Sequence, residues 1–301
     1  MTKNSIIRKC STILALSVIL AVLLPLVACA KEPVELTGTI RMTTRAPEVR
    51  IVVDGAENIA INWGDGRVSN VSDVLSTSEV IDDAGTFRRY NFSQIYSDTR
   101  ARNIVITGNV TSLTLNDNQL TALDVSGATT LEHLNVSNNQ LTALDVSRNT
   151  ALISLVVSWN QLTRLDVSGA KALTHLSCRS NQLTAIDLSR NDALEQLWLT
   201  GNQLTSLDVS RNTALVRLEL HFNQLTSLDV SRNTALLSLC VAGNQFTASA
   251  LNDLFRTLPR HEPYGGSISI NTAWPQPDDP VFEADRSIAE ERGWTFRACR
   301  L

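Results

Sequence analysis

Residues 139–152 read NQLTALDVSRNTAL, and close copies of this stretch recur along the middle of the chain. The asparagine that opens it returns every 21 residues, at Asn118, Asn139, Asn160, Asn181, Asn202, Asn223 and Asn244. A fixed period of this length is typical of a solenoid, in which a coil cannot bury its apolar face alone and must stack on its neighbours. The period therefore predicts a column of stacked coils over residues 109–247.

The apolar residues inside each copy follow the pattern L-x-x-L-x-L-x-x-N-x-L. One copy reads Leu131, Leu134, Val136, Asn139 and Leu141, and seven copies can be counted along the chain. This pattern is identified as the leucine-rich-repeat signature. Each L-x-L segment should form a short strand, with successive strands paired in parallel about 4.8 Å apart. We therefore expect a leucine-rich-repeat solenoid of the α/β horseshoe class, mostly β with little helix.

Two polar residue types recur with the leucines, and both predict structural roles. The repeated asparagine falls where the chain turns, so its amide should bond backbone groups that would otherwise be buried unpaired. The repeated aspartates should accept turn N–H groups, with nearby arginines offsetting their mutual repulsion; they are Asp124, Asp145, Asp166, Asp187, Asp208 and Asp229. One carboxylate per coil is too few for a calcium site, so we expect no metal and no other cofactor.

The sequence and period of these copies resemble the internalin-like repeats of bacterial surface proteins, in the 21-residue class found in Bacteroidetes surface lipoproteins. In that class a cysteine often occupies the second strand position, which here holds cysteine only at Cys178. We expect Cys178 to be a buried small hydrophobe. Cys240 falls on an outward strand position about 14 Å away, too far for a disulfide with Cys178. No role for Cys240 or Cys299 follows from the sequence.

The first 28 residues have the features of a secretory signal peptide: a basic start, an apolar run and small residues at the end. The sequence Leu26-Val27-Ala28-Cys29 resembles the lipobox of bacterial lipoproteins. The resemblance implies cleavage after Ala28 and lipid attachment at Cys29, with residues 29–34 as an anchor linker. An ordinary cleaved signal and an uncleaved membrane helix are the alternatives. The implied location is the cell envelope, at the outer membrane, with the protein facing either the periplasm or the cell surface.

Residues 35–108 contain strand-like runs separated by turn residues, which predict a small β-sandwich that covers the open end of the first coil. The runs are residues 38–45, 49–53, 59–63, 87–92 and 104–107. The sequence from Asn62 to Gly66, NWGDG, resembles in shortened form a motif of PKD-type domains. There we expect Trp63 to fill the core and Asp65 to bond turn amides.

Residues 248–301 no longer follow the repeat, and we expect them to form an α/β cap over the last coil. Residues 249–258 have helical spacing, 266–270 form a strand, 285–293 a short helix, and Trp294 and Phe296 lie in a closing strand. Solenoids need such atypical terminal units to shield their last apolar face. The stretch from Asp285 to Trp294 also resembles the C-terminal cap of Bacteroidetes repeat proteins.

The outward positions of the strands vary between copies, whereas the remainder of each copy is nearly repeated. Stacking therefore does not dictate these residues, and exposed aromatic and arginine side chains are frequent interface anchors. The predicted ligand-binding residues, centred on Trp198, are Trp159, His175, Arg179, Trp198, Arg217, Glu219, His221 and Phe222. The alternative is a solvated strand face that carries a few aromatic residues by chance.

These features favour a binding protein over an enzyme. The sequence has no nucleophile elbow, phosphate-binding loop or metalloprotease helix. Its formal net charge of −4 argues against a nucleic-acid partner. We expect a cell-envelope lipoprotein that binds a protein, on a host or a bacterial surface, through the concave face of the solenoid. The alternatives are a carbohydrate-binding accessory lipoprotein, because tryptophan faces also stack on sugars, and a structural envelope component.

Overall fold

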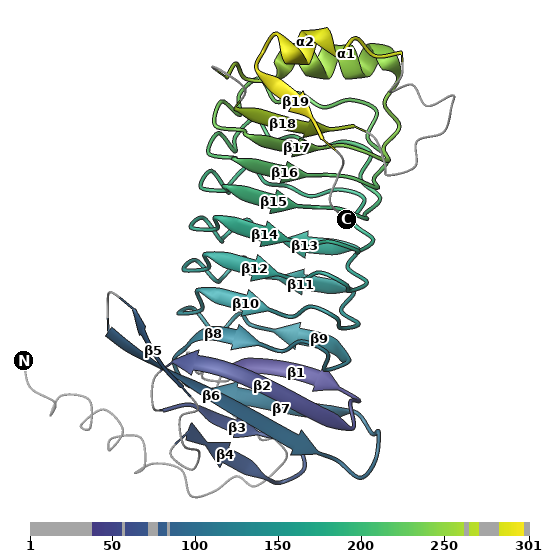
Figure 1. Ribbon diagram of the computed structural model, residues 1–301. Coiled ribbons are helices and arrows are strands. Elements are labelled where there is room, and N and C mark those ends of the chain that lie inside the picture. The colour runs from purple at the N-terminus through teal and green to yellow at the C-terminus, as the bar shows by residue number, and fades with distance from the viewer. Residues whose placement is uncertain are drawn as a thin grey trace, which may run out of the picture. The chain divides into compact units, whose positions relative to one another are not determined.

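The seven L-x-L segments form seven short strands that stack one above another (Figure 1). These strands are β8 (Val110–Thr114), β10 (His133–Asn135), β12 (Ser154–Val156), β14 (His175–Ser177), β15 (Gln196–Trp198), β16 (Arg217–Glu219) and β17 (Ser238–Cys240). They pair in parallel, and each residue lies opposite the one 21 positions later, as His133 lies opposite Ser154. The predicted mostly-β solenoid with little helix is confirmed.

The computed structural model describes residues 38–55, 58–71, 78–82, 85–261, 265–270 and 283–297, with the backbone alone for 78–82 and 85–88. All of these belong to one compact unit, Glu35–Leu301. The predicted signal peptide (residues 1–28), Cys29, the linker 29–34 and Cys299 lie outside the described residues. No helix in the described part of the chain is long and apolar enough to cross a membrane.

A continuous column of leucines fills the inside of the stack. The central residue of each strand points inward, and Leu155, Leu176, Leu197 and Leu218 are fully buried. Burying such a side chain contributes roughly 2 kcal/mol. Every coil contributes leucines at equivalent positions, so the apolar core is shared between neighbouring coils and no single coil has a core of its own.

The repeated asparagines join successive coils, as the sequence predicts. Asn181 accepts a hydrogen bond from the backbone N–H of Leu162 in the preceding coil, at 2.9 Å. Its amide donates to the carbonyl of Val157, at 3.0 Å, and to that of Cys178, at 3.1 Å. These backbone groups are therefore satisfied inside a turn that water does not reach.

A second series of buried asparagines was not predicted from the sequence; its members are Asn149, Asn191, Asn212 and Asn233. Each lies in the turn before the next strand and donates to carbonyls of the coil before it. Asn149, for example, donates to Val125 at 2.9 Å and to Ala128 at 2.8 Å. The second series is interrupted by Ala170, so the coils that carry both asparagines are held at two of their corners.

Past the asparagine turn, each coil runs through a second extended segment. Near the N-terminal end this segment forms β9 (Leu120–Asp124), β11 (Ala143–Asp145) and β13 (Arg164–Asp166), and β11 pairs with β13 in parallel. The aspartate that ends each segment accepts a hydrogen bond from the backbone N–H two residues later, at 2.9 Å for Asp166 and Ser168. The predicted turn-forming role of these aspartates is thus observed.

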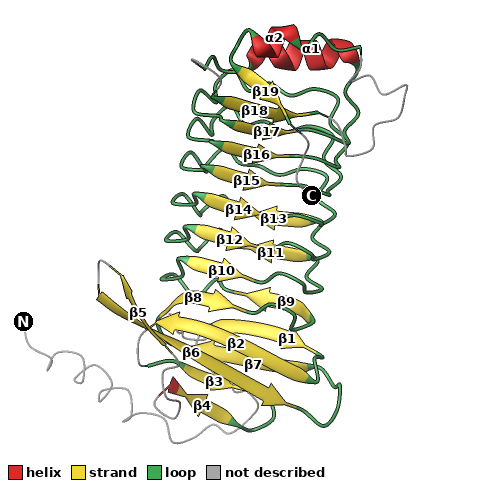
Figure 2. Cartoon of the chain, viewed as in Figure 1, coloured by secondary structure: helices red, strands yellow, loops and turns green. Residues whose placement is uncertain are grey.

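The N-terminal strands form two sheets that both continue into the solenoid (Figure 2). They are β1 (Ile40–Thr44), β2 (Glu48–Gly55), β3 (Ala60–Asn62), β4 (Val68–Asn70), β5 (Ser78–Asp82), β6 (Gly85–Ile95) and β7 (Arg102–Thr107). One sheet has the order β4-β3-β7-β1-β9, and β2 joins β6 to β8 in the other. Residues of both sheets, including Ile51 and Ile104, belong to one buried core. The region therefore merges with the first coil, and it includes two strands, β4 and β5, that the sequence pattern did not indicate.

The turn that resembles the PKD motif is held by short local contacts. Trp63 is almost fully buried, and its indole N–H donates to Ser69 Oγ at 2.9 Å. Asp65 accepts from the backbone N–H of Arg67 at 3.0 Å. Gly64 has φ +73°, a conformation that favours glycine. The motif therefore forms a tight turn beside the core.

The C-terminal end of the column is closed by α1 (Ala248–Thr257), β18 (Gly266–Ser269), α2 (Ser287–Glu290) and β19 (Trp294–Phe296). The side chain of Thr247 caps α1, and Leu251, Leu254 and Phe255 form its buried face. Strands β18 and β19 extend the parallel sheet beyond β17. The second helix is shorter than predicted, because the chain leaves it through a turn that ends at Gly293 with φ +81°.

Candidate functional site

The outward side chains of β14, β15 and β16 meet on the face of the long parallel sheet. Strand alternation turns Leu197 and Leu218 into the core, so Trp198 and Arg217 lie on the outer side. Five of the eight predicted residues contact one another there, and we call them the strand-face cluster: His175, Arg179, Trp198, Arg217 and Glu219. None of the five belongs to the leucine column.

Trp198 occupies the centre of the strand-face cluster and is partly covered by its neighbours. The imidazole of His175 stacks on the indole, with ring centroids 6.4 Å apart and planes inclined by 30°. The guanidinium of Arg179 lies 5.6 Å from the centre of the indole ring. The indole Nε1 is buried and has no hydrogen-bond partner among the described residues. A ligand on this face would therefore meet Trp198 together with His175 and Arg179.

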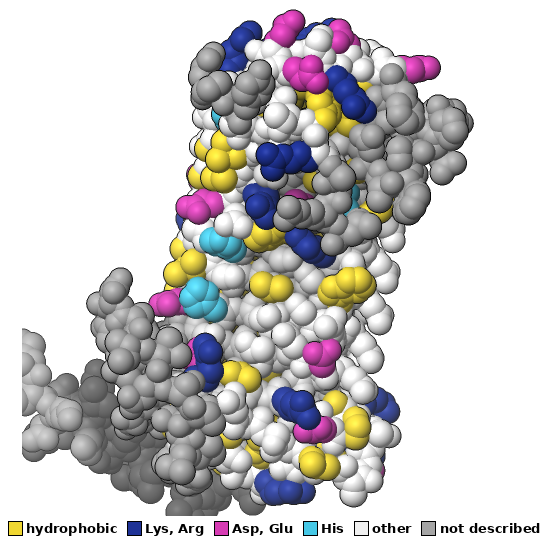
Figure 3. Space-filling model, viewed as in Figure 1, with side chains coloured by type: hydrophobic (Ala, Val, Ile, Leu, Met, Phe, Trp, Pro, Cys, Tyr) yellow, Lys and Arg dark blue, Asp and Glu magenta, His cyan; other side chains and the backbone are white. Residues whose placement is uncertain are grey.

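Glu219 lies between two arginines that come from different coils. Its Oε2 accepts from Arg179 Nη2 at 3.1 Å, and its Oε1 lies 3.9 Å from Arg217 Nη1. The Glu219 side chain is only 16% exposed, whereas that of Arg217 is 51% exposed. The strand-face cluster thus carries two arginines around one carboxylate, and Arg217 is the more exposed of the two. On the face shown in Figure 3, acidic and basic side chains are likewise interspersed along the column.

Trp159 and Phe222 lie at the edge of the sheet, just after β12 and β16. They are 61% and 45% exposed. Both have left-handed backbone conformations, with φ +58° and +57°. They therefore project from the turns as exposed rings that make no part of the core.

His221 differs from the expectation of an outward-facing residue, because it is only 3% exposed. Strand β16 ends at Glu219 and the chain turns at Phe222, so the alternation of inward and outward side chains no longer holds at His221. His221 Nδ1 lies 3.1 Å from Thr200 Oγ1, and its ring packs edge-on against Phe222 with centroids 5.4 Å apart. Burial lowers the pKa of His221, and the charge of Arg179 lowers it further against the opposing effect of Glu219. The residue supports Phe222 from beneath.

The two cysteines described in the structure have different states. Cys178 is fully buried and has a free thiol, as predicted. Cys240, also expected to face outward, is only 7% exposed and is disulfide-bonded. Within the described ranges, no group of three or more His, Cys, Asp or Glu residues could hold a metal ion.

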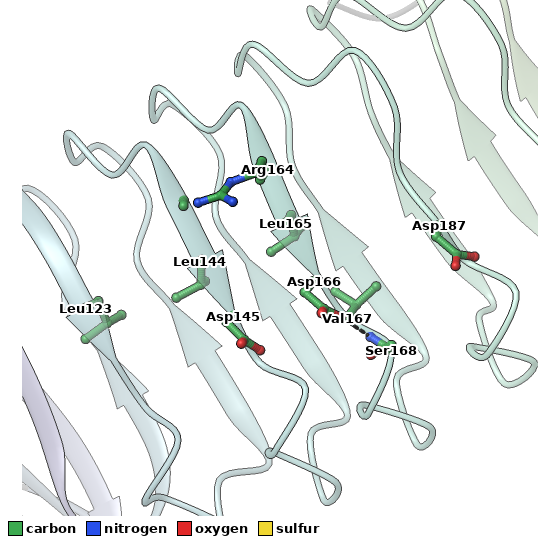
Figure 4. A pocket seen from close by; sticks show the side chains of 10 residues that line it. Leu123, Leu144, Asp145, Arg164, Leu165, Asp166, Val167, Ser168 and Asp187 are labelled. Carbon is green, nitrogen blue, oxygen red and sulfur yellow. Dashed lines mark hydrogen bonds between the residues drawn. The ribbon is translucent and has the colours of Figure 1, made fainter.

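A pocket of about 750 Å³ lies beyond the asparagine turns, and none of the eight predicted residues lines it. Leu123, Leu144 and Leu165 follow one another along its floor, with Arg164 on one side (Figure 4). The repeated aspartates border the other side, each already bonded to its turn. This pocket was not predicted from the sequence. Arg164 could have indicated it, because the other coils carry alanine or serine at the same position of the second segment.

Comparison with known families agrees with the observed coils. A family model for two copies of leucine-rich repeats matches residues 171–212, and a single-repeat model matches residues 130–149. These coils are leucine-rich repeats. Leucine-rich-repeat solenoids are generally binding scaffolds, because stacked repeats create an extended surface. No curated protein sequence matches the chain.

Several solved structures of leucine-rich-repeat proteins are similar to this chain. The functional domain of InlJ from Listeria monocytogenes, described as including a cysteine ladder, is 32% identical over 64% of this chain and 39% of its own, with a TM-score of 0.49. A leucine-rich-repeat protein from Leptospira interrogans is 20% identical over 61% of this chain and 53% of its own, with a TM-score of 0.47. The Listeria internalin InlF is 18% identical, with coverages of 62% and 60% and a TM-score of 0.41. This chain therefore spans between 39% and 60% of the lengths of these proteins.

Proposed function

We propose that this chain is a cell-envelope lipoprotein whose leucine-rich-repeat solenoid binds a protein partner through the face of its long parallel sheet. The observation that carries the proposal is the strand-face cluster. Its five side chains come from three adjoining coils, surround one tryptophan and take no part in the core. Tryptophan and arginine are the residues most enriched among interface anchors.

A comparison among the coils supports the same conclusion. At the third strand position the chain carries Asn135, Val156, Ser177, Trp198 and Glu219 in successive coils, whereas the inward leucine is kept throughout. Since the stack accepts all of these residues, packing does not require Trp198 or Glu219. Recognition of a partner supplies a reason for them. Adhesion to a host or to another surface is the form of binding that we propose.

Photo-crosslinking in intact cells tests the binding face. A photoreactive residue at position 196 or 217 should form adducts with a protein, because Gln196 and Arg217 border Trp198 on the sheet. The matched control is position 205, since Thr205 is exposed and lies in the coil of Trp198 beyond the asparagine turn. Trp198→Ala should abolish the adducts. Equal labelling from position 205, or adducts that survive Trp198→Ala, would reject the proposed face.

The lipid anchor at Cys29 is part of the same proposal. Three acyl chains on that residue would hold the protein on a membrane, because each buried methylene contributes roughly 0.8 kcal/mol. The disulfide of Cys240 supports export, since disulfides persist in oxidising compartments. We place the protein on the outer membrane, exposed at the cell surface.

Fractionation and protease treatment test this location. Cys29→Ala should move the protein from the membrane fraction into the soluble fraction or the medium. Protease added to intact cells should remove the solenoid if it faces outward. Membrane retention of Cys29→Ala contradicts the anchor, and full protection from protease contradicts surface exposure.

A further inference from the structure

One position in every coil has a left-handed backbone, and most coils fill it with residues suited to that conformation. It is the residue directly before the repeated asparagine of each coil, with positive φ at Asp117, Asn138, Trp159, Ser180, Gly201, Phe222 and Gly243. Glycine, asparagine and aspartate are the usual occupants of such a conformation. Trp159 and Phe222 are therefore unusual occupants.

Neither aromatic residue is compensated by burial. The left-handed conformation is unfavourable for a residue with a Cβ. At 61% and 45% exposure, the rings of Trp159 and Phe222 leave much of their surface in water. Glycine would fit the same turn without strain, as it does at Gly201 and Gly243. Packing within the solenoid gives no reason for the ring of Trp159 and only a partial one for that of Phe222, which contacts His221, whereas contact with a ligand would account for both.

Two coils separate Trp159 from Phe222 along the edge. The backbone positions of the two residues are three strand spacings apart, about 14 Å. The coils between them carry Ser180 and Gly201, and the three atoms nearest to a Cβ added at Gly201 all belong to Ser180, at 3.4 Å and beyond. The ring of Phe222 lies instead over Gly243, where an added Cβ would be 2.7 Å from it. Along this edge, the two positions between Trp159 and Phe222 therefore carry only small residues, Ser180 and Gly201.

The surface beside this space is polar and electrically balanced. Ser158 Oγ and Ser177 Oγ lie 2.9 Å apart, so their hydroxyl groups bond one another. Thr200 Oγ1 contacts the imidazole of His221 at 3.1 Å. The nearest cation, Arg179, is paired with Glu219. Ser158 is buried, so a ligand here would meet two apolar rings and the partly exposed Ser177 and Thr200, but little net charge.

We propose that Trp159 and Phe222 form a binding site for a neutral, linear oligosaccharide. Pyranose rings offer apolar C–H faces that stack on aromatic rings, and their hydroxyl groups match the polar surface between them. A charged polymer would gain little from the neutralised Arg179–Glu219 pair. A sugar unit is about as long as one strand spacing, so a chain of four or more units is needed to touch both rings. This site does not depend on the protein partner proposed for the strand-face cluster.

Tryptophan fluorescence of the full chain tests the site, with neutral hexasaccharides of β-1,4-glucan, β-1,3-glucan, xylan and mannan as probes. At least one should shift the emission of the exposed Trp159 to shorter wavelength. Trp159→Gly and Phe222→Gly, followed by calorimetry, should each weaken binding by about tenfold or more, corresponding to 1.4 kcal/mol. Both variants should fold at least as stably as the parent, because glycine suits the turn. The disaccharide of the same sugar should bind far more weakly.

The matched control is Asn138→Gly, which makes the same exchange at the same turn position outside the pair and should leave binding unchanged. No response to any of the four hexasaccharides overturns the proposal. The proposal is also overturned if both glycine variants bind with the affinity of the parent, or if the disaccharide binds as tightly as the hexasaccharide. The strand-face photo-crosslinking experiment uses different residues, so failure of either proposal can be told from failure of the other.

Discussion

Arg179 donates from Nη2 to Oε2 of Glu219 at 3.1 Å, although β15, the strand of Trp198, lies between β14, which precedes Arg179, and β16, which ends at Glu219. To make this contact, the arginine side chain extends across the indole face. The pair therefore controls how much of Trp198 a partner can reach. Two coils of separation are enough for one side chain to join them, so the strand-face cluster is coupled across the repeat.

Glu219→Gln should release the arginine and expose the indole. The amide keeps the shape of the side chain but loses the charge that holds Arg179. We expect stronger acrylamide quenching of Trp198, measured in a Trp159→Gly, Trp274→Phe background, because Trp63 and Trp294 are buried. The loss of unfolding free energy should stay within about 1 kcal/mol, because the pair is partly solvated. Arg217→Gln is the control, since its contact with Glu219 is 3.9 Å long. Unchanged quenching in Glu219→Gln would show that the ion pair does not cover Trp198.

Asn181→Ala should destabilise the solenoid strongly. The substitution leaves the backbone N–H of Leu162 and the carbonyls of Val157 and Cys178 without their side-chain partner in a buried turn. An unsatisfied buried group costs roughly 1–3 kcal/mol, so we expect a loss of about 3 kcal/mol in urea unfolding. Gln182→Ala, one residue away and exposed, should change the free energy of unfolding little. Similar losses for both variants would contradict the ladder role of Asn181.

The thiol of Cys178 should resist modification while the protein is folded. It is fully buried, and burial raises the pKa of the thiol well above its usual range, so almost no thiolate is present at neutral pH. Iodoacetamide should label position 178 only after denaturation, and mass spectrometry of the digested protein can locate the label. Cys178→Ala is the control for the assignment. Rapid labelling of the native protein would place this residue outside the leucine column.

The aspartate series should make stability fall in acid. Hydrogen bonds from Ser168 lower the pKa of Asp166, and those from Ser189 and Ser210 do the same for Asp187 and Asp208. A carboxylate whose pKa is lower when folded stabilises the protein above its ordinary pKa of about 3.9 and loses that effect as the pH falls through the folded-state value. The unfolding midpoint should therefore drop progressively below about pH 5.

Asparagine substitutions separate this titration from the turn itself. An Asn at positions 166, 187 and 208 can still accept the serine N–H but cannot ionise. The triple variant should fold and show a flatter dependence of the unfolding midpoint on pH. A dependence as steep as that of the parent would assign the acid sensitivity to other groups.

Much of the solenoid could be predicted because the same packing and hydrogen-bonding contacts recur in every coil. The inward leucines and the repeated asparagine each recur at one spacing, so one copy explains all copies, and Asn181 does what the pattern indicated. The N-terminal region has no such redundancy. Its strands β4 and β5 carry Ser, Asn and Asp, which are poor strand formers, and pairing with neighbouring strands overrides that preference.

The site was less predictable because its contacts join different coils. Alternation placed Trp198 and Arg217 on the outside, but it could not show that Arg179 crosses the indole. It also failed for His221, where the strand has already begun to turn. A signal for that turn was present, because Gly201 and Gly243 occupy the position that Phe222 holds in its own coil. Aligning the copies at this position would have indicated a left-handed backbone.

The asparagine series has a consequence for how this protein can change. Its bonds lie within one coil or link a coil to its immediate neighbour, so removal or duplication of one whole 21-residue unit leaves every bond able to form again across the new junction. Recombination within the gene could thus slide Trp159 and Phe222 apart or together in steps of one coil. The spacing between the two aromatic residues, and with it the length of ligand that can contact both, would then change by one coil at a time while the fold stays the same.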